Sequence, residues 1–295
     1  MTFSVAYVFD TGFERCTLVS LHSLLTHASC PLEIALFSET PSAEFSRRIA
    51  ALEKVFPGST MTLRPLPGAA RGAATRGHIS AATMGRLFLP EVMTGRVLYI
   101  DGDTLVRHDI APLGQADLEG RPLGACRAPR MHGAWLTTQE PHRVLWPRPF
   151  RQRVAAAQAI PGLDPGQYVN AGVLLMDMES IQAEGFVQPM ADWRQAETYT
   201  QRDQDHLNIV FRDRITFLAP EWNSIWGNMR TARRPFRAAE RAAYAISRDD
   251  PAILHYTGKR KPWGGDTRAR KTRERRWGAE WCAAEARMLS QLDSI

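Results

Sequence analysis

The chain has 295 residues, of which 44% are hydrophobic and 23% are charged, so its composition is that of a globular protein and not of a disordered one. Its four cysteines (Cys16, Cys30, Cys126 and Cys282) lack metal-binding spacing, which predicts structural thiols in a reducing compartment. Because no apolar run is long enough for a membrane span and the first residues do not resemble a signal peptide, we expect a cytoplasmic protein.

The net charge of +6 is concentrated near the carboxyl end. Residues 259–276 hold nine of the 37 lysines and arginines and only two of the 31 acids, which leaves 28 basic and 29 acidic residues elsewhere. A protein built around nucleic acid is therefore not expected. The basic segment predicts either an anionic partner or a solvated surface.

The first half of the chain predicts alternating strands and helices. An apolar run at 3–10 predicts a strand that ends at an acid, and leucines at helical spacing predict a helix at 14–27. A strand at 32–37 and an amphipathic helix at 41–56 follow in the same way. This alternation predicts a parallel sheet with helices on its faces.

A helix at 79–89 and a strand at 97–100 then lead to two acids, Asp101 and Asp103. In open α/β sheets, ligands bind beyond the carboxyl ends of the strands. We therefore expect Asp10, at the end of the first strand, to lie at the same edge as this pair.

The second half begins with a segment at 128–167 that is rich in tryptophan and proline and has no clean period. It predicts irregular structure that covers a site or shapes its pocket. The elements predicted after it are a strand at 168–177, helices at 179–196 and 203–211, and strands at 215–218 and 253–256. The expected organisation is one domain at 1–263 followed by a basic, tryptophan-containing helical appendage at 264–295.

The strand ending Asp101-Gly102-Asp103 carries the sharpest signal for a site. Side chains two apart on a strand point the same way, so both carboxylates can bind one hard cation while Gly102 leaves room for a ligand. The alternative is an ordinary strand-ending turn, which the turn preference of these residue types favours when the motif is taken alone.

Six segments, in the same order, resemble glycosyltransferase family 8, the retaining enzymes that include bacterial lipopolysaccharide galactosyl- and glucosyltransferases and the glycogenins. The segments are 8–13, 84–90, 97–105, 168–178, 203–208 and 255–263. The resemblance implies an α/β GT-A fold, with a Rossmann-like mixed sheet flanked by helices. It also implies a nucleotide-sugar donor and, usually, manganese.

A divalent cation is the expected Lewis acid for a diphosphate leaving group. Asp101 and Asp103 supply oxygen ligands, and the resemblance implies His255 as the third protein ligand. Two carboxylates with one imidazole suit manganese better than calcium, with magnesium as the alternative. The resemblance also places Gly258 and Lys261 at the diphosphate. Taken alone, His255 is more typical of a satisfied core histidine.

On the donor side, Asp10 and Phe13 resemble the uracil-binding acid and aromatic of the family, and Arg86 resembles its donor-contacting arginine. Thr11 and Gly12 replace the polar residues that usually lie between the first two. Uridine specificity is therefore an inference from the resemblance, and Phe13 can equally belong to the core.

The remaining predicted site residues are Asn170 and Gly172 on the donor-side strand, and the catalytic candidates Asp203, Gln204 and Asp205. An oxocarbenium-like transition state needs carboxylates and dipoles near the anomeric carbon. Gln204 resembles the residue that supports the β face of the sugar. Because an amide is a feeble nucleophile, we expect front-face attack by the acceptor. The alternative is a helix N-terminus that Asp203 caps.

The sequence thus predicts a retaining hexosyltransferase that uses UDP-glucose or UDP-galactose and a saccharide acceptor such as a lipopolysaccharide or another cell-surface glycan. One alternative is a nucleotide-sugar-binding protein without turnover. A haloacid-dehalogenase-type phosphatase fits poorly, because Gly102 separates the acids and Thr104 follows directly. Residues 259–281, with Trp277 and Trp281, resemble the basic, aromatic ends that hold some bacterial members on the inner membrane, and a solvated helix is the equal alternative.

Overall fold

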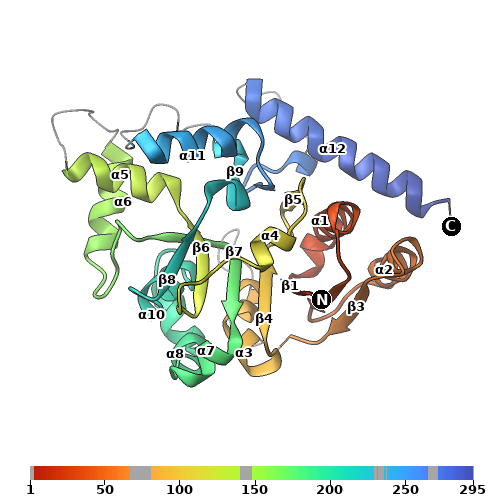
Figure 1. The fold of residues 1–295 in the computed structure, drawn as a ribbon, viewed down its shortest axis with the longest axis horizontal. Coiled ribbons are helices and arrows are strands. Elements are labelled where there is room, and N and C mark those ends of the chain that lie inside the picture. The colour runs from red at the N-terminus through yellow and green to blue at the C-terminus, as the bar shows by residue number, and fades with distance from the viewer. Residues whose placement is uncertain are drawn as a thin grey trace.

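The computed structural model describes residues 3–66, 81–139, 148–228, 231, 236, 238–264 and 272–294. Within these ranges, a seven-stranded sheet lies at the centre with helices on both faces, and a three-stranded sheet lies beside it (Figure 1). The predicted fold class, a mixed α/β sheet flanked by helices, is confirmed.

The strands are β1 (Phe3–Val8), β2 (Leu32–Phe37), β3 (Thr60–Arg64), β4 (Arg96–Ile100), β5 (Thr104–Val106), β6 (Leu123–Arg127), β7 (Val169–Asp177), β8 (Ile215–Leu218), β9 (Ser224–Ile225) and β10 (Ile253–His255). The α-helices are α1 (Glu14–His27), α2 (Ala43–Val55), α3 (Leu89–Val92), α4 (Ala111–Gly114), α5 (Pro129–Gln139), α6 (Arg148–Gln158), α7 (Met178–Ala183), α8 (Val187–Ala191), α9 (Trp193–Thr198), α10 (Asp203–Val210), α11 (Ala238–Asp249) and α12 (Thr272–Leu292). The short 3-10 helices are η1 (Thr11–Phe13), η3 (Ala81–Phe88), η4 (Pro220–Asn223), η5 (Trp226–Asn228) and η7 (Pro262–Gly264).

The large sheet has the order β3-β2-β1-β4-β7-β6-β8, and its first four strands run parallel. The carboxyl ends of β1 and β4 therefore meet at one edge, which places Asp10 and the Asp101/Asp103 pair together as predicted. Strand β7 runs antiparallel to β4, so the amino end of β7 reaches the same edge, where the Asp101 N–H donates to the Gly172 carbonyl at 2.8 Å.

Strand β4 is buried on both faces, because a hydrophobic core lies on each side of the sheet. Leu98 and Ile100 face the core that α1 and α2 cover, whereas Val97 and Tyr99 face the core that η3 covers. A strand buried in this way is a continuous apolar run with no polar alternation, which is the pattern of its sequence. Its rigid end fixes the two aspartates.

The prediction of irregular structure at 128–167 is wrong, because this segment contains α5 and α6. Helix α5 buries polar as well as apolar side chains, including His132 and Thr137, so no single apolar stripe marks it in the sequence. Pro129 does not prevent the helix because it is the first helical residue, where no intrahelical N–H bond is lost.

The helix predicted at 179–196 is instead three short helices, α7, α8 and α9. Gly185 breaks the chain with a φ of +76°, a left-handed conformation that suits glycine. Asp192 then caps α9 by accepting from the Gln195 N–H at 3.0 Å. The helix predicted at 79–89 is of the 3-10 type over Ala81–Phe88, and residues 79–80 lie outside the described part.

Helix α12 packs along α1 and α2 (Figure 1). Trp277 and Trp281 are 1% and 0% exposed and belong to the core that also contains β1 and α1. The expectation that these two tryptophans meet a membrane interface is therefore wrong. The domain boundary after residue 263 stays a prediction. No helix among the described residues combines the length and the apolar character that crossing a membrane requires.

Candidate active site

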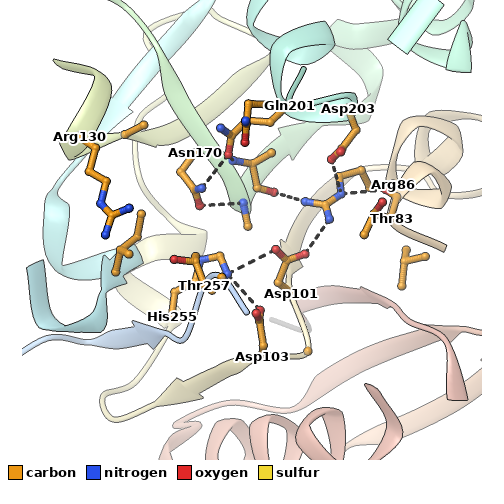
Figure 2. Close-up of a pocket in the computed structure, with 18 of the residues that line it drawn as sticks. Thr83, Arg86, Asp101, Asp103, Arg130, Asn170, Gln201, Asp203, His255 and Thr257 are labelled. Carbon is orange, nitrogen blue, oxygen red and sulfur yellow. Dashed lines mark hydrogen bonds and ion pairs between the residues drawn. The ribbon is translucent and has the colours of Figure 1, made fainter. Parts of the chain in front are cut away.

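A cleft of about 380 Å³ opens at the sheet edge where β1, β4 and β7 meet (Figure 2). Nearly all the predicted site residues line it: Asp10, Phe13, Arg86, Asp101, Gly102, Asp103, Asn170, Gly172, Asp203, Gln204, His255, Gly258 and Lys261. Asp205 is the exception, because it does not line this cleft. Segments more than 150 residues apart in the sequence thus converge on one site.

Asp101, Asp103 and His255 form a cluster whose ligand atoms all lie within 4.8 Å of one another. The His255 Nε2 lies 3.0 Å from Asp103 Oδ1 and 3.5 Å from Asp101 Oδ2. Pairing between β5 and β10 brings them together, since His255 lies opposite Thr104 in that antiparallel ladder. Two carboxylates and an imidazole are a donor set that fits a transition-type divalent cation such as Mn²⁺.

The imidazole of His255 is oriented from behind by Asn223. The His255 Nδ1 lies 2.9 Å from Asn223 Oδ1, an amide oxygen that can only accept a hydrogen bond. Nδ1 therefore donates to Asn223, and Nε2 faces the two aspartates. Metal-binding histidines are held in this way by a partner on their other nitrogen.

Gly172 gives the imidazole its space. A Cβ on this residue would lie 2.1 Å from His255 Cε1 and 2.8 Å from Asp101 Oδ2. The need for a glycine at position 102 has a different reason from the one expected. A Cβ on Gly102 would lie 2.2 Å from Thr17 Oγ1 of α1. The explanation that Gly102 leaves room for a ligand is therefore wrong: α1 occupies that side.

Asp103 is held ionised by its neighbours. Burial alone would raise its pKa, but His255 and the Lys261 ammonium, which donates to Asp103 Oδ2, hold the pKa of Asp103 well below its usual range. Asp101 accepts from the Tyr99 hydroxyl at 2.5 Å and pairs with Arg86 Nη2 at 2.9 Å. Each carboxylate of the cluster therefore has a fixed cationic or hydroxyl partner.

Arg86 is a buried cross-link beneath the cleft, only 4% exposed. It contacts Asp101, donates to the Ala171 carbonyl at 2.6 Å and lies 3.2 Å from Asp203 Oδ2 (Figure 2). Burial favours its neutral form, but Asp101 and the other nearby acidic groups outweigh this and raise the pKa of Arg86. Arg86 therefore holds the carboxylates of Asp101 and Asp203 in place.

Asp203 is the first residue of α10, and Arg202, not Asp203, occupies the N-cap position. Burial raises the pKa of Asp203 to about 6, against the attraction of Arg86 and with a further contribution from Asp101. A carboxylate with a raised pKa in a cleft is typical of a functional group.

A directed chain of hydrogen bonds joins the cluster to Gln204. Asn223 Nδ2 donates to Asn170 Oδ1 at 2.8 Å, and Asn170 Nδ2 donates to Gln204 Oε1 at 2.7 Å. The Ala171 N–H also donates to Gln204 Oε1, at 3.2 Å, and Gln204 Nε2 donates to the Tyr168 hydroxyl at 3.0 Å. The amide of Gln204 is therefore fixed at both ends.

Asp205 lies behind this chain. Its carboxylate accepts from the Tyr168 hydroxyl and, at 2.8 Å, from the Gln201 N–H. The residue is buried and does not line the cleft. Its position supports a role in holding Tyr168 and not the direct catalytic role predicted for it.

Beside Asp103, Phe13 and Lys261 lie together in the cleft. The Lys261 Nζ is 5.5 Å from the centre of the Phe13 ring and 5.7 Å from that of Trp263. Phe13 lines the cleft and also packs against the core, and its contact with a base stays a prediction. Gly258, with a φ of +87°, makes the turn that returns Lys261 toward His255.

Several lining residues were not found from the sequence. They are Thr83, Arg130, Met131, Arg153, Gln201 and Thr257, among others. Three of them come from α5 and α6, the segment expected to shape the pocket. The excess of arginine in that segment was the available signal.

Comparison with known proteins agrees with this geometry. The family model "Glycosyl transferase family 8" matches residues 4–267. General stress protein A of Bacillus subtilis (strain 168) is 26% identical over 204 residues, which cover 66% of this chain and 64% of that protein. Probable galacturonosyltransferase-like 4 of Arabidopsis thaliana is 23% identical over 277 residues, which cover 88% and 72%.

Among solved structures, the galactosyltransferase LgtC, in complex with donor and acceptor sugar analogues, superposes with a TM-score of 0.72 at 21% identity over 99% of this chain and 96% of LgtC. The bifunctional glycosyltransferase WbbM gives 0.73 at 22% identity, over 98% of this chain and 51% of WbbM. These likenesses confirm the GT-A fold. Because the family model spans nearly all of the sequence, the chain belongs to glycosyltransferase family 8.

Proposed function

We propose that this chain is a retaining, metal-dependent hexosyltransferase that transfers glucose or galactose from UDP-glucose or UDP-galactose to a saccharide acceptor. The observation that carries the proposal is the convergence of Asp101, Asp103, His255 and Lys261 in one cleft. The proposed acceptor is a lipopolysaccharide or another cell-surface glycan, which rests on the resemblance to bacterial members of the family.

The side chains present fit a divalent cation. Asp101 and Asp103 would hold it with His255, whose Nε2 is turned toward them by the bond between Nδ1 and Asn223. The absent side chain of Gly172 leaves the imidazole its place. A bound Mn²⁺, or Mg²⁺ as the alternative, would supply Lewis-acid neutralisation of a diphosphate.

The residues around the cluster supply the rest of the proposed donor site. Lys261 adds a fixed cation beside the aspartates, and the Phe13 ring offers a flat surface near Asp10 for the base. Asp203 accepts hydrogen bonds from donor hydroxyls, since Arg86 holds its carboxylate at the cleft wall.

Front-face attack is the proposed mechanism. The acceptor hydroxyl oxygen bonds to the anomeric carbon while the bond to the diphosphate oxygen breaks on the same face, and the leaving oxygen takes the hydroxyl proton. The geometry of Gln204 supports this, because its amide oxygen already accepts from Asn170 and from the Ala171 N–H. An amide so engaged is an even poorer nucleophile than a free one.

Turnover of UDP-glucose and UDP-galactose, with and without Mn²⁺, tests the proposal. We expect a metal requirement, retention of the anomeric configuration by NMR, and loss of at least about 100-fold in kcat for Asp103→Ala. Asp117→Ala, at an exposed carboxylate outside the cleft, is the matched control. Normal turnover by Asp103→Ala would refute the proposal. Donor binding without hydrolysis or transfer would favour a nucleotide-sugar-binding protein.

We also propose a cytoplasmic location with peripheral contact between residues 259–281 and an anionic membrane. With the tryptophans buried, only the basic residues support it, each contributing on the order of 1 kcal/mol near such a surface. Co-sedimentation with vesicles containing phosphatidylglycerol should occur at low salt and fail with neutral vesicles. Equal sedimentation with both would contradict the electrostatic contact.

A further inference from the structure

Helix α1 packs against β5, the strand that begins directly after Asp103, and brings a buried hydroxyl group to it (Figure 1). Ser20 Oγ of α1 lies 2.7 Å from Thr104 Oγ1 of β5 and 3.0 Å from the Tyr7 hydroxyl of β1. All three residues are 0% exposed. Because a buried hydroxyl group costs free energy unless it is hydrogen-bonded, these contacts decide how the three side chains are oriented.

These three side chains form a hydroxyl chain that ends on the main chain of Asp101. The Thr104 hydroxyl donates to the Asp101 carbonyl oxygen at 2.9 Å, and a carbonyl oxygen can only accept. Because each hydroxyl group has a single proton, Ser20 must then donate to Thr104, and Tyr7 must donate to Ser20. Burial raises the pKa of Tyr7, which keeps the first donor protonated. The hydroxyl chain therefore has one direction, from the core of the protein to Asp101.

Thr104 lies between the two parts of the candidate metal cluster of Asp101, Asp103 and His255. Its side chain bonds to Asp101, and its backbone lies opposite His255 in the antiparallel ladder of β5 and β10. The Asp101 N–H donates to the Gly172 carbonyl at 2.8 Å, so both main-chain polar groups of Asp101 are held. The direction in which Asp101 projects its carboxylate therefore depends on the Thr104 hydroxyl.

We infer that the residues of the hydroxyl chain are positioning residues for a divalent cation, because they hold the main chain of Asp101 and with it one of the cation's ligands. The inference rests on the proposed function, whose cation site it deepens. None of the three hydroxyl residues lines the cleft, so they act through Asp101 and not on a substrate. Loss of a hydrogen bond behind a metal ligand typically weakens metal binding by about 10- to 100-fold.

The dissociation constant of Mn²⁺ alone, measured by electron paramagnetic resonance of the free ion, tests the inference. Thr104→Val removes the hydroxyl group but keeps a β-branched side chain of similar size, so the backbone pairing with β10 needs no change. We expect it to weaken Mn²⁺ binding about 10-fold, at the lower end of that range. Thr104→Ser keeps a hydroxyl group that can still donate to Asp101, and it should bind Mn²⁺ within about twofold of the wild type.

Ser20→Ala tests whether the chain acts as a unit. It removes the donor that fixes the Thr104 hydroxyl, so Mn²⁺ binding should weaken by about threefold. In Thr104→Val the chain is already cut, and adding Ser20→Ala should have no further effect on Mn²⁺ binding. An additive loss would show that Ser20 acts by another route and would overturn the hydroxyl chain. If Thr104→Val does not fold, Ser20→Ala and Tyr7→Phe decide the question, the second with a smaller loss in the same direction.

Thr216→Val is the matched control, because Thr216 is a buried threonine whose hydroxyl donates to the Leu118 carbonyl at 2.6 Å and which does not line the cleft. It should lower the Tm and leave the Mn²⁺ affinity unchanged. If Thr104→Val and Ser20→Ala do the same, the hydroxyl groups only support the fold, and the inference is overturned. If the wild-type protein itself binds no Mn²⁺, the proposed function fails and the inference fails with it, which is a different result from Mn²⁺ binding that the variants leave unchanged.

Discussion

Gly172 is the single residue on which the geometry of the candidate metal cluster of Asp101, Asp103 and His255 depends most directly. A methyl group there would lie 2.1 Å from His255 Cε1 and 2.8 Å from Asp101 Oδ2, so both side chains would have to move. We expect Gly172→Ala to lower Mn²⁺ affinity at least about 10-fold, as displacement of ligand geometry does. Electron paramagnetic resonance of free Mn²⁺ measures this directly.

Gly58→Ala is the control for that substitution, because no atom lies within 4 Å of its Cβ position. It should bind Mn²⁺ as the wild type does. If Gly172→Ala also binds Mn²⁺ with unchanged affinity, the cluster of Asp101, Asp103 and His255 is not the metal site.

Asp203 gives a pH dependence with a definite sign. Its pKa is about 6 in the folded protein and about 3.9 in an unfolded chain, so the folded state holds the proton more tightly. Its ionisation therefore lowers stability as the pH rises from about 4 to about 6, by about 3 kcal/mol in all. Asp203→Asn should lack this loss and should gain stability relative to the wild type mainly above pH 6.

Urea unfolding at pH 4.5 and pH 7.5 measures the effect as a difference between differences. The free energy of unfolding of Asp203→Asn, minus that of the wild type, should be larger at the higher pH. Asp117→Asn, at an exposed carboxylate, controls for general charge effects. The same difference at both pH values would show that Asp203 does not titrate near pH 6.

Individual site residues were predictable where a strand carries them and less so where a helix does. Asp101 and Asp103 follow β4 and reach one cluster, as side-chain alternation predicts. Asp203 and Asp205 are also two apart, but on a helix such residues lie on different sides. Asp203 thus faces the cleft and Asp205 faces Tyr168, a distinction that family order alone did not make.

At the scale of elements, β1 and β2 were predicted because each is a continuous apolar run that contributes to both cores, and α2 because it buries Phe45, Ile49 and Leu52 at helical spacing. Helix α5 was missed because it buries polar as well as apolar side chains, and α6 because only Val154 and Ala157 are buried among its residues 151–158, too few to mark an apolar stripe. The pairing of β5 with β10 leaves no local signal at all, yet it brings His255 to the aspartates. Only the resemblance to the family predicted that this histidine joins the two aspartates.

Asn223 lies at the end of η4, after β8, and links three other elements of the site. It accepts from His255 on β10 and donates to Asn170 on β7, and Asn170 in turn donates to Gln204 on α10. We expect Asn223→Leu to weaken Mn²⁺ binding by about 10- to 100-fold, the usual effect of losing the partner of a ligating histidine. Calorimetry with Mn²⁺ measures the affinity, and the ¹⁵N shifts of the His255 ring report the loss of its Nδ1–H tautomer.

Asn223→Asp separates the two hydrogen bonds that Asn223 makes, the one with His255 and the one with Asn170. An aspartate still accepts from His255 Nδ1–H but cannot donate to Asn170, so Mn²⁺ affinity should largely return while sugar transfer stays low. Thr216→Val controls for the loss of a buried hydrogen bond away from the cleft. Restored transfer in Asn223→Asp would show that the link to Gln204 is not needed.

For the whole molecule, α12 connects stability to the site. The Tyr256 hydroxyl donates to the Trp277 carbonyl at 2.9 Å, and Tyr256 directly follows His255. Trp281 is fully buried in the core shared with α1, and its ring lies 4.8 Å from that of Trp263. Helix α12 thus supports the segment that carries His255 and Lys261.

Trp281→Ala should therefore lower the free energy of unfolding by about 3 to 5 kcal/mol, the usual loss for a buried large aromatic. Leu289→Ala, at a side chain of the same helix that is 38% exposed, should cost less than about 1 kcal/mol. If the proposed donor site is right, UDP with Mn²⁺ binds the folded protein alone, and saturating amounts should raise the Tm of Trp281→Ala as long as its cleft still forms. A wild-type Tm in Trp281→Ala would mean that residues 264–295 are a separable appendage, in agreement with the predicted boundary. A large loss in the free energy of unfolding would mean that α12 belongs to the same folding unit as the sheet.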